Sequence, residues 1–192
     1  MIKLIFNIIL YFLLIYLIEK NIKFETGLLL KSILFAILIP IYNLKFHIDS
    51  PSLIYIIFIV YGIIINILPE KWIKTDSLRI YINTKRLILI PISASITEEV
   101  FFRGILNELL VDVINNVIYV SLISSFLFAL IHIFNFLNGI EEKKYFLITF
   151  PFRFAFGIFF SIIYFKYGIL STIFLHFLVD FPALLRIYKR VH

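Results

Sequence analysis

Seven runs of apolar residues, separated by short charged or turn-rich breaks, dominate the chain. The runs cover residues 4–18, 28–42, 52–68, 87–110, 117–136, 147–165 and 169–187. Most approach the length of about 20 residues that an α-helix needs to cross a bilayer, and none shows the two-residue alternation of a barrel strand. Backbone polar groups must be paired inside lipid, so the pattern predicts an all-α, polytopic transmembrane helix bundle of about seven or eight spans.

The composition agrees with this pattern and limits the domain organisation. Of the 192 residues, 62% are hydrophobic, 18% aromatic and only 16% charged, which exceeds the apolar share of a soluble domain. We expect residues 1–84 to hold N-terminal transmembrane helices and an amphipathic cytoplasmic loop, and residues 85–192 to form a second helix bundle. The loop, 69–86, contains Trp72 among basic residues, and we interpret it as an interfacial anchor.

The absence of cysteine and the scatter of basic residues exclude several classes of function. Without cysteine there is no disulfide, no thiolate nucleophile and no Cys-ligated metal. The net charge is +6, yet the basic residues never form a stripe with stacking aromatic residues, so no nucleic-acid partner is expected.

The distribution of Lys and Arg predicts the orientation of the bundle. Seven spans place three of these residues on one side, Lys3, Lys45 and Lys166. They place thirteen on the other side, namely Lys20, Lys23, Lys31, Lys71, Lys74, Arg79, Lys85, Arg86, Lys143, Lys144, Arg186, Lys189 and Arg190. By the positive-inside rule we expect a multi-pass protein of the cell membrane with a cytoplasmic C-terminus.

Three ionisable residues, Glu98, Glu99 and Arg103, lie close together within the fourth apolar run. Glu98 lies about 18 Å beyond Arg86 on a helix that rises about 1.5 Å per residue, close to a bilayer midplane, where ionisable groups are costly and usually functional. Glu99 and Arg103 are four residues apart and share a helix face, so we expect an ion pair. Glu98 points about 100° away and needs a partner from another helix.

Two later runs carry further histidine or acidic side chains. They are His132 in the fifth run, and His176 with Asp180, one helical turn apart, in the seventh. A single membrane histidine is often just a helix–helix hydrogen bond, but three helices that each carry such groups indicate a functional site. We expect the segment 141–144 to be a solvated turn.

These residues permit two mechanisms of hydrolysis. Without a metal, Glu98 takes a proton from water and His176 supplies positive charge or a donor to the tetrahedral intermediate. With a metal, Glu98, His132 and His176 ligate zinc or another divalent ion, which lowers the pKa of a bound water to about 7. The H-E-x-x-H spacing of soluble zinc proteases is absent.

In order and spacing, Glu98-Glu99-x-x-x-Arg103, Phe128-x-x-x-His132 and His176-x-x-x-Asp180 resemble the three motifs of the CAAX protease and bacteriocin-processing (Abi) family of intramembrane endopeptidases. The resemblance covers roughly residues 85–188. It implies that residues 85–192 are the catalytic bundle and that Glu98 activates the attacking water beside His132. It also implies that His176 and residue 180 stabilise the oxyanion, while Glu99 and Arg103 hold the site together.

One position departs from the family pattern. The prenyl-endopeptidase branch has Asn at the last motif position, where this chain has Asp180. Asn can donate a hydrogen bond to an oxyanion and an ionised Asp cannot, so Asp180 is better suited to orient His176 or to help hold a metal.

We therefore expect a membrane-embedded endopeptidase that acts on a prenylated CAAX-type tail or a bacteriocin precursor, with membrane lipids as its other partners. A proton-coupled transporter is an alternative, because buried Glu, His and Asp also form proton relays, although paired repeats with broken helices are missing. A non-catalytic immunity or scaffold protein with the same fold is the second alternative. The sequence leaves the substrate and the oligomeric state open.

Overall fold

The computed structural model describes residues 2–47, 51–68 and 82–191. The elements in these ranges are all helices, which confirms the all-α prediction. In chain order they are α1 (Ile2–Asn21), α2 (Phe24–Ile41), α3 (Ser52–Ile67), α4 (Thr84–Glu98), the π-helix η1 (Glu99–Leu106), α5 (Asn107–Ile114), α6 (Val117–Ile131), α7 (Ile133–Leu137), α8 (Lys143–Tyr167) and α9 (Ile169–Val191).

These elements join into rods that correspond to the seven predicted apolar runs. Helices α4, η1 and α5 follow one another directly, with helical backbone angles at Glu99 and Asn107, and α6 meets α7 at His132. Within the described ranges five helical segments have the length and hydropathy of a membrane span, and α3, with 16 residues, is a shorter apolar helix. The protein is therefore a multi-pass membrane protein.

The central rod differs from the prediction in its local geometry. We expected an unbroken α-helix over 87–110, but residues 99–106 form a π-helix whose eight residues are all buried. Such segments are rare and often lie at functional sites, because the wider turn changes the direction of the side chains that follow. The hydropathy pattern does not distinguish the two helix types, because an α-helix and a π-helix would bury the same apolar residues here.

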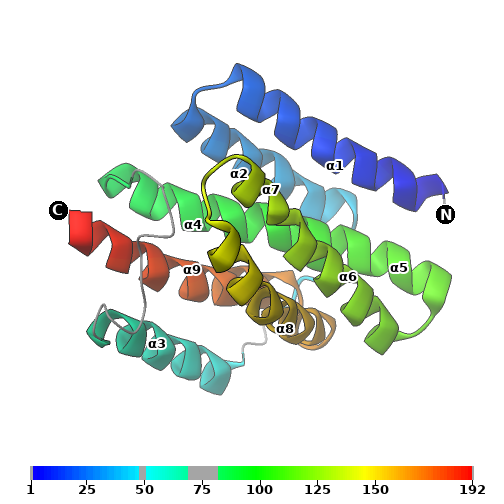
Figure 1. Cartoon of the computed structure of the whole chain (residues 1–192). Helices are drawn as coiled ribbons and strands as arrows, with labels where there is room; N and C mark the ends of the chain where they lie inside the picture. The colour runs from blue at the N-terminus through cyan, green and yellow to red at the C-terminus, as the bar shows by residue number, and fades with distance from the viewer. Residues whose placement is uncertain (1, 48–50, 69–81, 192) are drawn as a thin grey trace.

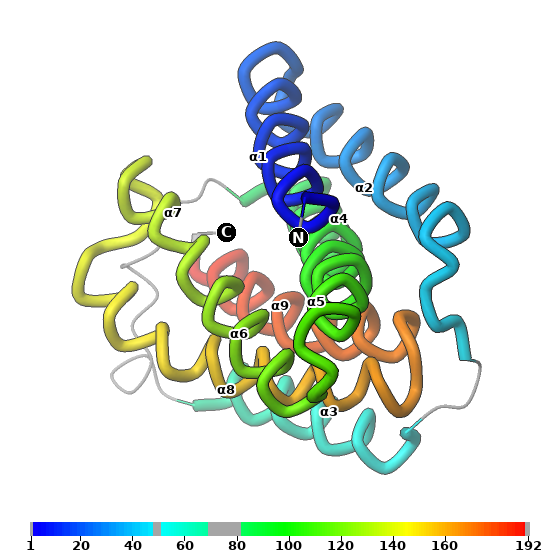
Figure 2. Tube along the Cα trace, turned by 90° about the vertical axis from the view of Figure 1, so that its right-hand side faces the viewer, coloured from blue at the N-terminus to red at the C-terminus, as the bar shows by residue number. Residues whose placement is uncertain are grey.

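The bundle is built around α4 and α9, which pack against each other (Figures 1 and 2). Helix α2 packs on α4, with α1 next to α2, and α3 packs on α9 on the opposite side. Helices α6 and α8 pack together and close the remaining side around η1. The first three helices thus cover the rods that carry the polar motifs, and the division at residue 84 stays a prediction.

The start of α1 and the end of α9 lie at opposite ends of the bundle (Figure 1). This arrangement requires an odd number of rods, as the predicted topology does. The connections 22–23 and 138–142 lie at the end where α9 finishes, in agreement with the predicted grouping of basic residues. Most of the predicted amphipathic loop, residues 69–81, lies outside the described residues.

Aromatic residues surround η1 and belong to one buried apolar cluster with it. Tyr11 of α1 stacks on Phe101 with 3.9 Å between ring centroids, and Phe102 contacts Phe128 of α6 edge to face at 5.5 Å. Both η1 aromatics are buried, whereas most of α1 exposes large apolar side chains such as Phe6 and Tyr16 to the surroundings. Lipid replaces water on that outer surface, so only the inner faces need dense packing.

Small residues allow two pairs of helices to approach closely. A Cβ at Gly157 of α8 would lie 2.8 Å from the Ser125 Cβ and 3.1 Å from the Ser125 Cα of α6. A Cβ at Gly62 of α3 would lie 2.6 Å from the Pro182 Cγ of α9. Close backbone approach at small residues is the usual basis of helix packing in membranes.

Arg186 joins α9 to the end of α3. Its guanidinium donates to the carbonyl of Ile65 and, at 2.8 Å, to the carbonyl of Leu68. A cation at these carbonyls pairs them and complements the negative end of the helix. Arg186 is buried and lies near the end of α9, the end that the charge distribution predicts to be cytoplasmic.

The contact at Gly157 yields a first prediction. Gly157→Ala should lower the thermal unfolding midpoint in detergent, because overpacking costs about 1–3 kcal/mol, whereas alanine gains at most about 1 kcal/mol of helix propensity. The matched control is Gly27→Ala in α2, where the new Cβ meets only the Ile18 Cγ2 at 3.3 Å. A Gly157→Ala protein as stable as the Gly27→Ala protein would show that α6 and α8 can separate freely.

The second prediction concerns orientation. Reporter fusions should place the N-terminus outside and the C-terminus in the cytoplasm, because the cluster of thirteen Lys and Arg residues resists translocation. Fusions that report the same side for both ends would contradict the seven-rod topology. Fusions that report the reverse orientation would contradict only the charge argument.

Candidate active site

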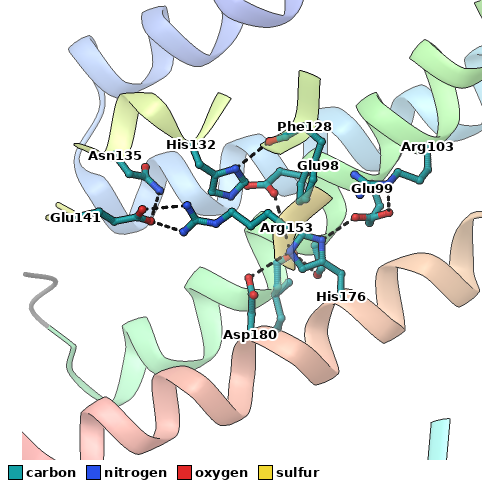
Figure 3. A network of polar contacts seen from close by, with 12 residues as sticks. Glu98, Glu99, Arg103, Phe128, His132, Asn135, Glu141, Arg153, His176 and Asp180 are labelled. Carbon is teal, nitrogen blue, oxygen red and sulfur yellow. Dashed lines mark hydrogen bonds and ion pairs between the residues drawn. The ribbon is translucent and has the colours of Figure 1, made fainter. Parts of the chain in front are cut away.

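The polar motif residues come from three rods and meet inside the bundle (Figure 3). Glu98 ends α4 and Glu99 begins η1, so the two carboxylates lie at the change of helix type. His132 lies at the junction of α6 and α7. His176 and Asp180 lie one turn apart on α9, which packs against both α4 and η1.

Glu99 has two partners and no exposed surface. Its Oε2 lies 3.3 Å from Arg103 Nε, and both side chains are fully buried. Its Oε1 lies 2.7 Å from His176 Nδ1. The pair with Arg103 confirms the prediction from sequence, while the bond to His176 was not predicted, because it joins helices 77 positions apart in the chain.

Arg103 obtains the rest of its stabilisation from aromatic rings. Its guanidinium carbon lies 4.0 Å from the Phe128 ring centroid and 5.8 Å from that of Phe160. Attraction between a cation and an aromatic face is strongest where water is excluded. Because Nη1 and Nη2 have no hydrogen-bond partner among the described residues, the charge of Arg103 depends on Glu99 and these two rings.

His176 is the link between the carboxylates. An ionised carboxylate only accepts hydrogen bonds, so Nδ1 carries the hydrogen that it donates to Glu99. On the other side of the ring, Nε2 lies 3.3 Å from Asp180 Oδ2 and 3.9 Å from Glu98 Oε2. Glu98 therefore has the partner from another helix that its direction on α4 required.

Exposure separates the two adjacent glutamates. The side chains of Glu98 and Asp180 are 22% and 33% exposed, whereas that of Glu99 is 0% exposed. Only Glu98 can therefore contact a molecule that enters the site, while Glu99 holds Arg103 and His176.

His132 faces the same region from the end of α6. Its Nδ1 lies 2.9 Å from the Phe128 carbonyl, which can only accept, so a neutral His132 donates from Nδ1 and has Nε2 as an acceptor. Figure 3 shows its ring and the Glu98 side chain pointing toward each other. The Phe128 ring contacts both His132 and His176, with centroids at 5.1 and 6.0 Å.

A second polar cluster beside His132 was missed from the sequence. Glu141 pairs with Arg153 of α8 at 2.6 Å and accepts a bond from Asn135 at 3.0 Å. We expected 141–144 to be a solvated turn, but Glu141 is buried, while its neighbours Glu142, Lys143 and Lys144 are exposed. The available signal was Arg153, a charge within an apolar run that needed an acidic partner.

The predicted metal ligands do not form a ready metal site. Among the described residues no three His, Asp or Glu side chains are arranged to hold a metal ion. Glu99 occupies Nδ1 of His176, and the Phe128 carbonyl occupies Nδ1 of His132. The ligand set Glu98, His132 and His176 stays a prediction.

An apolar hollow lies next to this site. It measures about 290 Å³ and is lined by Phe58 of α3 and by Phe152, Ala155, Phe156 and Phe159 of α8. None of the charged site residues lines it, so the hollow itself offers no acid–base group. Phe160 links it to the site, because its ring contacts both Phe156 and His176.

Comparison with known proteins places these observations in a family. Residues 82–182 match the family model described as type II CAAX prenyl endopeptidase Rce1-like. No curated protein and no solved structure matches the chain. The matched region contains every motif residue discussed above, and it begins close to the predicted boundary at residue 85.

The third prediction separates the roles of the two glutamates. Glu99→Gln should destabilise the protein by about 3–5 kcal/mol, because it leaves Arg103 as an uncompensated buried charge. Glu98→Gln, an isosteric change at a more exposed position, should leave thermal unfolding in detergent close to wild type. Equal losses of stability in the two variants would contradict the assignment of Glu99 as the structural carboxylate.

Proposed function

The chain belongs to the Rce1-like family of type II CAAX prenyl endopeptidases, and we propose that it hydrolyses a peptide bond in a membrane-associated substrate with water activated by Glu98. Family membership supports a membrane protease that takes a peptide or a prenylated protein as substrate. The observation that carries the proposal is the contrast between the accessible Glu98 and the fully buried, doubly paired Glu99.

In this proposal Glu98 is the general base. Its side chain is partly exposed, and no lysine or arginine pairs with it among the described residues, so it can accept a proton from water. His132 points toward the same carboxylate and offers Nε2 as a second acceptor for a water hydrogen. The attacking oxygen would thus be oriented by two side chains from different helices.

His176 would act on the other side of the reacting carbonyl. Glu99 fixes the ring through Nδ1 and leaves Nε2 directed toward Glu98 and Asp180. When Nε2 carries a hydrogen, it can donate to the oxyanion of the tetrahedral intermediate. Asp180 would keep this hydrogen in place and would itself make no contact with the oxyanion, because an ionised carboxylate cannot donate.

The proton and the bonds balance in two steps. Glu98 takes a proton while the water oxygen bonds to the carbonyl carbon, and the carbonyl electrons move to the oxygen beside His176. The intermediate then re-forms the carbonyl, the C–N bond breaks, and Glu98 returns the proton to the leaving amine. No covalent enzyme intermediate is required, in agreement with the absence of cysteine from the chain.

The substrate is proposed at the level of two classes, a prenylated CAAX-type tail and a bacteriocin precursor. The family model supports the first class through its prenyl-endopeptidase description. The chain has Asp180 where the prenyl-endopeptidase branch has Asn. Because of this difference, a bacteriocin precursor remains the second proposed substrate class. A multi-pass protein with its site between α4, α6 and α9 suits any substrate whose tail reaches the site while its anchor stays in lipid.

The fourth prediction is cleavage of one substrate class. Purified protein in detergent should release a C-terminal peptide from a prenylated or bacteriocin-precursor substrate, and mass spectrometry in ¹⁸O-labelled water should show one labelled oxygen in the new carboxylate. Glu98→Gln should reduce the rate by at least about 100-fold, in line with the usual contribution of a general base. Glu142→Gln, at an exposed position outside the site, is the matched control.

Adding a chelator to the cleavage assay distinguishes the two mechanisms of hydrolysis, and the absence of cleavage would direct attention to the alternative functions. Activity that survives a chelator supports the reaction through side chains alone, whereas activity lost with the chelator and restored by zinc would favour the ligand set Glu98, His132 and His176. If folded wild-type protein cleaves neither class, the endopeptidase proposal fails. The non-catalytic immunity or scaffold protein and the proton-coupled transporter would then be tested by partner capture and by proton flux.

A further inference from the structure

We propose that Glu141 is a positioning residue for His132, acting through Asn135 and Arg153. None of these three residues belongs to the motifs that indicated the site. The predicted effect of Glu141 on the rate of substrate cleavage rests on the proposed function. The geometric claim, that the Glu141 carboxylate fixes the place of the His132 ring, can be tested independently of any activity.

The backbone after His132 is held by Asn135. The Asn135 N–H donates to the His132 carbonyl at 3.1 Å, and the Asn135 carbonyl accepts from the N–H groups of Ile140 and Glu141 at 2.8 and 3.1 Å. Asn135 thus ties the start of α7 to the turn that leads into α8. His132, as the residue where α6 ends, moves with this unit.

The Glu141 carboxylate connects Asn135 of α7 to Arg153 of α8. Its Oε1 accepts from Asn135 Nδ2 at 3.0 Å and from Arg153 Nη2 at 2.6 Å, and its Oε2 accepts from Arg153 Nη1 at 3.0 Å. The side chains of Glu141 and Arg153 are 3% and 18% exposed. A two-point bond between a carboxylate and a guanidinium fixes orientation as well as distance, and burial strengthens it.

Helix α7 has little else to hold it in place. It has five residues, and none of them is buried. An isolated helix of this length is unstable, because helix nucleation is unfavourable and only a few bonds follow it. Phe134 of α7 contacts Phe12 of α1 edge to face, with ring centroids at 6.2 Å. The polar contacts that tie α7 to α8 are the Glu141–Arg153 pair and the Asn135 amide.

Arg153 carries this constraint into the site. Arg153 lies two residues after Pro151, inside α8. Figure 3 shows its side chain extending from the side of His176 and Asp180, past His132, to Glu141. A change in the Glu141–Arg153 bond would consequently shift both the backbone that carries His132 and a charge beside its ring.

A purely stabilising role explains this arrangement less well. Both charges lose hydration on burial, and replacing such a pair by apolar residues is often neutral or stabilising. A role in positioning His132 explains why Glu141 also binds Asn135, and why the Glu141–Arg153 pair lies next to this histidine. The two roles differ in what they predict for His132 in a protein that remains folded.

The test is histidine NMR of the full chain in detergent with ¹³C-labelled imidazoles. The chain has four histidines, His47, His132, His176 and His192, and each signal can be assigned from a single His→Gln variant. Glu141→Gln should move the His132 signal and leave that of His47 in place. The matched control is the adjacent exposed Glu142→Gln, which should move none of the four.

Three outcomes would overturn the proposal. They are an unmoved His132 signal in folded Glu141→Gln protein, equal shifts of all four histidines, and a similar His132 shift in the Glu142→Gln control. If Glu141→Gln does not fold, Asn135→Ala replaces it, because that variant removes only the amide bond to Glu141 and keeps the ion pair. It should move the His132 signal in the same direction by a smaller amount.

The kinetic readout joins the geometry to catalysis. If a substrate class is cleaved, Glu141→Gln should lower kcat by about 100-fold with KM nearly unchanged, because a small misplacement of a catalytic group acts on the reaction step. An unchanged kcat together with a moved His132 signal would overturn the catalytic part of the proposal. If the wild type cleaves nothing, the NMR result still decides the geometric part, so the two failures can be told apart.

Discussion

The structure depends on the compensation of charge in a region without water. Arg103 is fully buried in an apolar bundle, and a lone cation there would be strongly destabilising. Glu99 supplies the opposite charge, and the rings of Phe128 and Phe160 supply negative faces. Each of these partners belongs to a different rod, so the requirement to neutralise Arg103 also fixes how η1, α6 and α8 meet.

The same compensation creates the chemical difference between two adjacent carboxylates. Glu99 is the first residue of the π-helix, and both its oxygens are engaged, by Arg103 and by His176. Glu98, the last residue of α4, is rotated away toward the more open side, where Asp180 and His132 also lie. The two adjacent positions therefore separate a buried, doubly paired carboxylate from a partly exposed one, and the proposed hydrolysis rests on that separation.

A second buried pair repeats this principle closer to the end of the bundle. Glu141 and Arg153 neutralise each other and fix the short helix α7, which follows His132 directly. The two pairs thus hold the two histidines from opposite directions, with Glu99 contacting His176 and the Glu141 cluster tied to the backbone at His132. Buried charges are costly in a membrane, and in this protein each pair adjoins a residue of the candidate site.

Contacts within one element could be predicted from the sequence. The apolar runs determined the seven rods, and the four-residue spacing predicted the Glu99–Arg103 pair, because helical geometry alone brings such residues together. The order of the three motifs also indicated the family that the comparison confirmed. These inferences need only local geometry and spacing, which the chain carries by itself.

Contacts between elements were decided by the tertiary structure. No local pattern in the chain directs His176 toward Glu99, buries Glu141 or places a π-helix after Glu98. The physical reason is that these helices are apolar on nearly every side, so the hydrophobic pattern does not specify which face turns inward. In a membrane that choice is made by close packing, as at Gly157 and Ser125, and by the need of each buried charge for a partner, and both depend on how the helices are placed together.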